Sequence, residues 1–123
     1  MNLDEIANAL AEACRTGGER GALETLYADD AVSVEAYDQG NGRITEGKAG
    51  ISGKHDWWEA NFEALEASVG GPHLHPGHGD VPDRFVLTFT LKAKFVETGE
   101  VSDMSEAGIY TVAGGKIVRE EFF

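Results

Sequence analysis

The chain has 123 residues, 41% of them hydrophobic and 26% charged, which is the balance of one globular domain with one core. Its 22 acidic and 10 basic residues give a net charge of −12. That charge argues against nucleic acid or an anionic membrane as partner, because both require a basic surface.

Two helices and a hairpin are predicted in the first third of the chain. Apolar residues recur at helical spacing from about residue 3 to 15, and Thr16-Gly17-Gly18 ends that helix. A second, shorter helix has one apolar face formed by Ala22, Leu23, Leu26 and Tyr27. Alternation of apolar and polar residues then predicts a strand over 31–37, and a turn-forming run, 38–42, leads into a returning strand at 43–46.

The third helix is predicted over roughly 48–67. Its apolar stripe, spaced 4, 3, 4 and 3 residues apart, predicts a buried face. The segment from Val69 to Pro82 is rich in glycine, proline and histidine, so we expect an irregular loop there. The stripe consists of Ile51, His55, Trp58, Phe62 and Leu65.

Three antiparallel strands are predicted to complete the chain. Residues 85–95 alternate between apolar and polar side chains, 101–112 form the next strand, and 116–122 the last. Gly114-Gly115 supplies a tight turn between the last two strands. The fold class is therefore α+β, a single domain over residues 1–123 with helices covering one face of a curved antiparallel sheet.

Three segments resemble the SnoaL-like domains of the nuclear transport factor 2-like superfamily. They are the run from Leu26 to Ala31, the Glu46-Gly47-Lys48 step into the third helix, and the late strands from Tyr110 to Phe123. The resemblance implies a cone of curved sheet packed on three helices from the N-terminal half, with an open apolar pocket. Ketosteroid isomerases, polyketide cyclases, epoxide hydrolases, dehydratases and domains without known activity share this pattern. Many are dimers through the outer sheet face, where Val86, Thr88 and Thr90 lie, so a homodimer is expected.

The same resemblance suggests catalytic carboxylates. It places the general base of the ketosteroid isomerases at Glu35 and their protonated acid near Glu106, whereas their oxyanion tyrosine falls on Ala11, which cannot serve. On the last strand Val118, Glu120 and Phe122 are expected to face the pocket. Carboxylates gathered in an apolar cone repel one another and resist ionisation, so one of them becomes a general acid/base candidate.

Simpler interpretations of these residues remain open. Val32 and Val34 look like the buried side of their strand, which would turn Glu35 outward, and surface glutamates need no special explanation in so acidic a chain. His55 is either a core histidine or a proton donor to the pocket. The aromatic candidates for the pocket wall are equally typical of core packing. They are Trp58, Phe62, Tyr110 and Phe122.

No cofactor or metal is expected. His73, His75 and His78 could in principle hold a transition metal, but a flexible loop lacks the supporting contacts that fix metal ligands, so a mobile lip of the pocket is the preferred interpretation. Gly114-Gly115-Lys116 does not have the spacing of a phosphate-binding loop. Cys14, the single cysteine, is expected to be a small buried residue.

Two hypotheses for function follow from the sequence. One is a cofactor-independent enzyme that transfers a proton on a small apolar molecule, using Glu35, Glu106, Glu120 and His55. The other is a non-catalytic ligand-binding or dimerisation module. The acidic N-terminal segment does not resemble a signal peptide, and no stretch approaches the roughly 18 apolar residues of a membrane span, so a cytoplasmic protein is expected.

Overall fold

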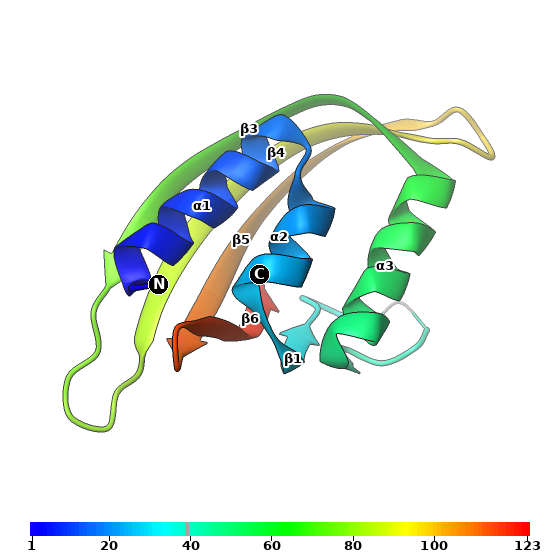
Figure 1. The fold of residues 1–123 in the computed structure, drawn as a ribbon. Helices are drawn as coiled ribbons and strands as arrows, with labels where there is room; N and C mark the ends of the chain where they lie inside the picture. Colours follow the sequence, from blue (N-terminus) through cyan, green and yellow to red (C-terminus); the bar gives the residue numbers. More distant parts are fainter. Residues whose placement is uncertain (39) are drawn as a thin grey trace.

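The computed structural model of the chain describes residues 1–38 and 40–123. Three helices lie on one face of a curved six-stranded sheet with the order β2-β1-β6-β5-β4-β3 (Figure 1). The predicted α+β class is confirmed, although β1 runs parallel to β6, so the sheet is mixed. The elements are α1 (Leu3–Thr16), α2 (Glu19–Leu26), β1 (Tyr27–Val34), β2 (Ile44–Glu46), α3 (Gly47–Asn61), β3 (Phe62–His75), β4 (Asp83–Phe95), β5 (Val101–Ala113) and β6 (Lys116–Phe122).

Helix α1 begins and ends where the sequence predicts. The Asn2 side chain accepts a hydrogen bond from the backbone N–H of Glu5 at 2.8 Å, and the Glu5 carboxylate accepts one from the Asn2 backbone at 3.0 Å. This reciprocal cap satisfies two backbone donors of the first turn. Gly17, at φ 76°, ends the helix in the left-handed conformation that glycine adopts without strain. The helix buries Ile6 and Leu10 against the sheet.

The largest difference from the sequence prediction concerns β3. Helix α3 ends at Asn61 and not near residue 67, and the strand that follows continues to His75, through most of the predicted loop. Pairing with β4 outweighs the helical preference of residues 63–67, which is a weak local effect. Gly70 and Pro72 are tolerated because β3 is an edge strand and its register shifts between Gly70 and His73.

The two faces of the sheet differ in cover. We call the face under the helices the inner face and the opposite one the outer face. On β4, Phe85 and Leu87 point to the inner face and are fully buried, whereas Val86, Thr88 and Thr90 point to the outer face. All three helices lie on the inner side (Figure 1). The core therefore forms between the helices and the inner face.

The last strand contains an irregularity that the sequence does not reveal. Thr111 pairs with Arg119 but the next residue, Val112, pairs with Ile117, so Val118 is an extra residue in β6. Ile117 consequently points to the inner face and is fully buried, although strict alternation predicts it on the opposite side. Glu120 keeps its predicted inner orientation because it lies beyond the bulge.

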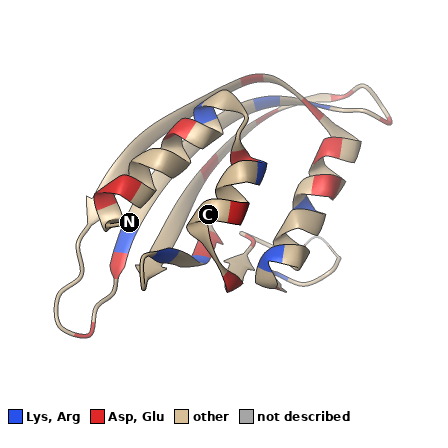
Figure 2. Ribbon diagram, viewed as in Figure 1, with Lys and Arg blue, Asp and Glu red and all other residues tan. Residues whose placement is uncertain are grey.

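Two further features concern the distribution of positive charge and the length of the helices. Lys and Arg are scattered singly over helices and strands and do not form a stripe (Figure 2). Among the described residues, no helix is long and apolar enough to cross a membrane.

Candidate functional site

Glu120 is a buried acid at the centre of the inner face. It lies on β6 between Tyr110 of β5 and Ser33 of β1, and its exposed fraction is 5%. The hydroxyl of Tyr27, at the start of β1, donates a hydrogen bond of 2.9 Å to its Oε2. Within residues 1–38 and 40–123, Glu120 is the one Asp, Glu, Lys, Arg or His side chain that is buried. Natural proteins seldom bury a carboxyl without a partner or a purpose.

Burial controls the protonation of Glu120. Loss of contact with water raises its pKa above that of a free glutamate, and the nearby Glu35 carboxylate adds to the rise. Hydrogen bonds from Tyr27 and Ser33 act in the opposite direction, as does the charge of Lys54. The neutral acid is therefore favoured more than in water, which suits a proton donor.

Lys54 brings a positive charge to the same place from helix α3. Its ammonium group donates a hydrogen bond of 2.7 Å to the Ser33 hydroxyl and forms an ion pair with Glu35. The ammonium also lies over the ring of Phe122, 5.9 Å from the ring centre. We call the polar residues joined in this way, together with Glu106, the inner polar cluster. Its members are Tyr27, Ser33, Glu35, Lys54, Glu106 and Glu120.

Glu106 forms the open end of the inner polar cluster. It lies on β5 opposite Phe89, and although the residue is exposed, partial burial of its carboxyl and the charges of Glu35 and Glu120 raise its pKa. Gly108 separates it from Tyr110 along the strand. A Cβ at that position would lie 2.9 Å from the Tyr110 hydroxyl, so glycine leaves the space that the tyrosine occupies.

Aromatic rings enclose the buried end of the cluster. Tyr110 stacks on Phe85 with ring centres 4.9 Å apart and meets Phe122 edge-on at 6.3 Å. Burial and the neighbouring Glu120 raise the pKa of Tyr110 well above its usual value. The phenol therefore stays neutral and remains a hydrogen-bond donor. Cys14 is half-buried, and burial followed by nearby acidic groups raises the pKa of its thiol to about 12, so it is a poor nucleophile.

The structure brings together five residues that the sequence singled out. Glu35, Glu106, Glu120, Tyr110 and Phe122 meet on the inner face. The alternative interpretation of β1, with Val32 and Val34 inward and Glu35 outward, is wrong. Helix α3 packs over the inner side of this strand and its Lys54 provides a partner for the polar side chains, so the strand buries Ser33 there.

The remaining candidates lie elsewhere. His55 points toward α2, where burial and the adjacent Arg20 lower its pKa. Trp58 stacks on Phe62, with ring centres 4.3 Å apart, and Phe62 in turn lies 5.3 Å from Phe95. That aromatic group lies where α3 ends and β3 begins, beside Phe95 at the end of β4.

Sequence reasoning missed Tyr27, Ser33 and Lys54. Lys54 follows Ile51 by three residues and therefore shares the buried side of α3, a signal that was available but is usually attributed to a solvated lysine. Ser33 lies between two valines, so simple hydrophobicity predicted the wrong face. The contact between α3 and β1 joins the two residues in one site.

Two other features lie apart from the cluster. His73 and His75 are on β3 opposite Val86 and Arg84, and no three His, Cys, Asp or Glu side chains converge as metal ligands in the described part of the chain. A hollow of about 580 Å³ opens on the outer face, on the opposite side of the sheet from the inner polar cluster. Its lining is Val34, Gly42, Arg43, Ile44, Arg119 and Glu121.

Comparison with known proteins identifies the family of the chain. Residues 7–120 match the model of the SnoaL-like domain, and the chain belongs to this family. A proposed SnoaL-like polyketide cyclase from Mesorhizobium loti is 37% identical, with a TM-score of 0.87 over 100% of this chain and 99% of that one. No curated protein matches the chain significantly.

More distant structures share the fold. A proposed isomerase from Bacillus subtilis is 20% identical, with a TM-score of 0.73 over 99% of this chain and 88% of its own. A protein with a ketosteroid isomerase-like fold from Catenulispora acidiphila, solved with trimethylamine, is 23% identical, with a TM-score of 0.67 over 97% and 84% of the two chains. These similarities establish a nuclear transport factor 2-like architecture, and the chemistry must be argued from the site.

Proposed function

We propose that this SnoaL-like domain is a cofactor-independent enzyme that moves a proton beside the carbonyl group of a small apolar molecule. The observation that carries the proposal is Glu120, a buried carboxyl with a raised pKa, a phenol donor at 2.9 Å and two further carboxylates nearby. Perturbed acids grouped on the concave side of a sheet are a common arrangement for general acid/base catalysis.

The acids differ in environment, which favours a division of roles. Glu35 is held in an ion pair with Lys54, so it is available as a carboxylate base. Glu120 favours its neutral form and would donate a proton to a developing oxyanion, while the hydrogen bond from Tyr27 holds the Glu120 carboxyl in position. Pairs of groups whose environments separate their protonation states are typical of acid/base sites. Tyr110 and Phe122 would contact the apolar part of the substrate.

The relatives support the same reaction class. The activities proposed for two similar structures are polyketide cyclase and isomerase. Removal of a proton next to a carbonyl group is a step that acid/base sites of carbonyl isomerases perform. The Mesorhizobium loti protein is similar enough in sequence to share a family, and the others share the fold. The cluster contains the acids and bases that such a step requires, and the step needs no redox group.

Hydrogen exchange on a small ketone tests the proposal. The native protein is incubated in D₂O with a panel of cyclic and aryl ketones, and exchange next to the carbonyl is followed by proton NMR. We expect exchange above the buffer rate and a loss of about 100-fold in Glu120→Gln and in Glu35→Gln. Glu121→Gln is the matched control, because Glu121 is the next residue but lies on the outer face, paired with Arg119. Equal losses in Glu120→Gln and Glu121→Gln, or no exchange by the native protein, would contradict the proposal.

A non-catalytic binding module is the second candidate, and one observation favours it. In the described part of the chain every buried polar side-chain atom has a hydrogen-bond partner, so the inner polar cluster is also satisfied as a structural network. Thermal-shift measurements with the same ketone panel separate the two candidates. Stabilisation by a ligand without any proton exchange would favour the binding module.

A further inference from the structure

Helix α3 is attached to the molecule differently from the other two helices. It has 15 residues, and Ile51 is the one that is buried. Helix α1 buries four residues in 14, and α2 buries three in eight. Burial of apolar surface is the main force that holds a helix to a sheet, so α3 has the weakest apolar attachment.

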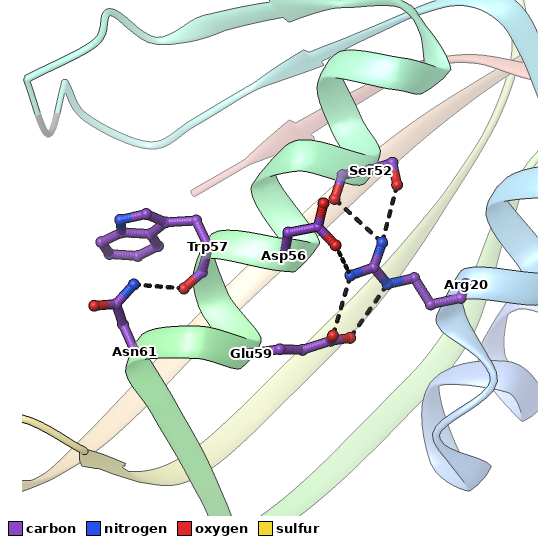
Figure 3. A network of polar contacts seen from close by, with 6 residues as sticks. All are labelled: Arg20, Ser52, Asp56, Trp57, Glu59 and Asn61. Carbon is purple, nitrogen blue, oxygen red and sulfur yellow. Dashed lines mark hydrogen bonds and ion pairs between the residues drawn. The ribbon is translucent and has the colours of Figure 1, made fainter.

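Charged groups make up much of what holds α3 in place. The guanidinium of Arg20, on α2, donates to the Ser52 hydroxyl at 2.9 Å and forms ion pairs with Asp56 at 2.5 Å and Glu59 at 3.1 Å (Figure 3). At the start of α3, Lys48 donates to the Glu24 backbone oxygen at 2.8 Å. Lys54 supplies the third link through Ser33 and Glu35.

We propose that α3 is a movable cover over the inner polar cluster and that Arg20 is the positioning residue that holds it closed. The Arg20 acceptors lie on successive turns of α3, on the side that faces α2 (Figure 3). Lys54 lies on the side that faces the sheet. When α3 moves away, Lys54 leaves Ser33 and Glu35, and the buried carboxyl of Glu120 becomes accessible to a ligand. This cover does not depend on whether the site is catalytic.

The closure is weak enough to open. The side chains of Arg20, Asp56 and Glu59 are 37%, 71% and 61% exposed, so water and salt screen their attraction. Arginine suits this position because its planar fork engages several acceptors at once, which lysine cannot do. Arg20→Lys therefore keeps the positive charge but only part of the attraction between Arg20 and α3.

The chain provides its own reporter of this motion, since both of its tryptophans, Trp57 and Trp58, lie on α3. Acrylamide quenching of their fluorescence and amide hydrogen exchange of α3 are measured at 0.05 M and 1 M NaCl. The variants are Arg20→Gln and Arg20→Lys. Arg15→Gln is the matched control, because Arg15 of α1 holds the backbone oxygens of Val69 and Gly71 on β3 and does not contact α3.

For the native protein we expect exchange of α3 amides to be about fivefold faster at high salt, with α1 and β4 amides unchanged. Arg20→Gln should show the fast exchange and stronger tryptophan quenching already at low salt, Arg20→Lys an intermediate result, and Arg15→Gln no change in α3. Two results would overturn the proposal. One is that the amide exchange rates of α3 change in every condition by the same factor as those of α1 and β4. The other is that Arg20→Gln keeps the native exchange rate in α3. Because neither readout involves turnover, this outcome is independent of the ketone assay.

Discussion

Glu120 and Glu121 are neighbours in the chain, yet they face opposite sides of one sheet and differ in almost every physical property. Glu120 is buried on the inner face, accepts a hydrogen bond from Tyr27 and has a raised pKa. Glu121 lies on the outer face, where it pairs with Arg119 two residues away. The comparison shows that the face of the sheet, and not the residue type, decides which carboxyl is suited to acid/base chemistry.

The same contrast extends along the strands. On the outer face, Lys92 pairs with Glu66 at 3.9 Å and Lys94 with Glu63 at 3.6 Å, and the exposed fractions of these side chains range from 42% to 77%. Exposed pairs of this kind contribute little to stability. On the inner face the ion pair of Lys54 and Glu35 is about 70% shielded from water, judged by exposed fractions of 28% and 30%. The ion pairs of the outer face are therefore ordinary surface contacts, whereas the ion pair of Lys54 and Glu35 belongs to the inner polar cluster.

Removing a ring from the inner face should produce the largest effect. Phe85 is fully buried and stacks on Tyr110, so Phe85→Ala should lower the free energy of unfolding by about 3–5 kcal/mol. Val101→Ala, on the outer face at the exposed start of β5, should cost about 1 kcal/mol or less. Urea titration followed by circular dichroism measures both. Similar losses in the two variants would contradict the difference in packing between these two positions.

A homodimer through the outer face is the next prediction. Its central positions carry Val86, Thr88, Thr90 and Ile109, which are apolar or weakly polar. The helices of the described residues all lie on the opposite face of the sheet (Figure 1). Light scattering at micromolar concentration should give about twice the 13.2 kDa of one chain. Thr88→Arg should reduce the mass to one chain without unfolding it, because a buried unpaired charge opposes association. A monomeric native protein would contradict the prediction.

Much of the fold was predictable because its signals are local. The capped α1, the β1–β2 hairpin and the alternating β4 follow from spacing, turn residues and periodicity. Strand β3 was not predictable in this way, since residues 63–67 favour a helix locally and become a strand only by pairing with β4. The bulge at Val118 also depends on pairing between strands.

The residues of the candidate site also divide into those with a signal in the sequence and those that depend on tertiary contacts. Glu35, Glu106 and Glu120 were accessible through their resemblance to a family and through strand alternation. Ser33 gave no signal and Lys54 only its position three residues after Ile51, because the role of both arises from a contact between α3 and β1. A polar residue between two valines gives no sign of its partner on a helix 21 residues away.

The pH dependence of stability sharpens the comparison between the two faces. Because the pKa of Glu120 is raised in the folded state, its contribution to stability is complete below the unfolded value near 4.3 and is lost as pH rises through the raised value. Glu120→Gln stays neutral at every pH, so it should be more stable than the native protein near pH 7, and Glu106→Gln should show a smaller gain. Glu121→Gln should reproduce the native curve. Coinciding curves for all four proteins between about pH 4 and 8 would mean that the inner carboxyls are solvated and independent.

The histidines of the outer face should give the smallest effect of all. His73 and His75 are exposed on β3, and the backbone of His78 pairs with Val81 in the turn that follows. Because exposed side chains without strong partners contribute little, changing all three to alanine should leave the melting temperature unchanged with a chelator present. The native protein should also keep its melting temperature when the chelator is added. A large fall on chelation would instead reveal a bound metal that stabilises the fold, since a ligand held only by the native state raises its stability. The outer side of the molecule would then carry a metal site, and the inner face the acid/base site.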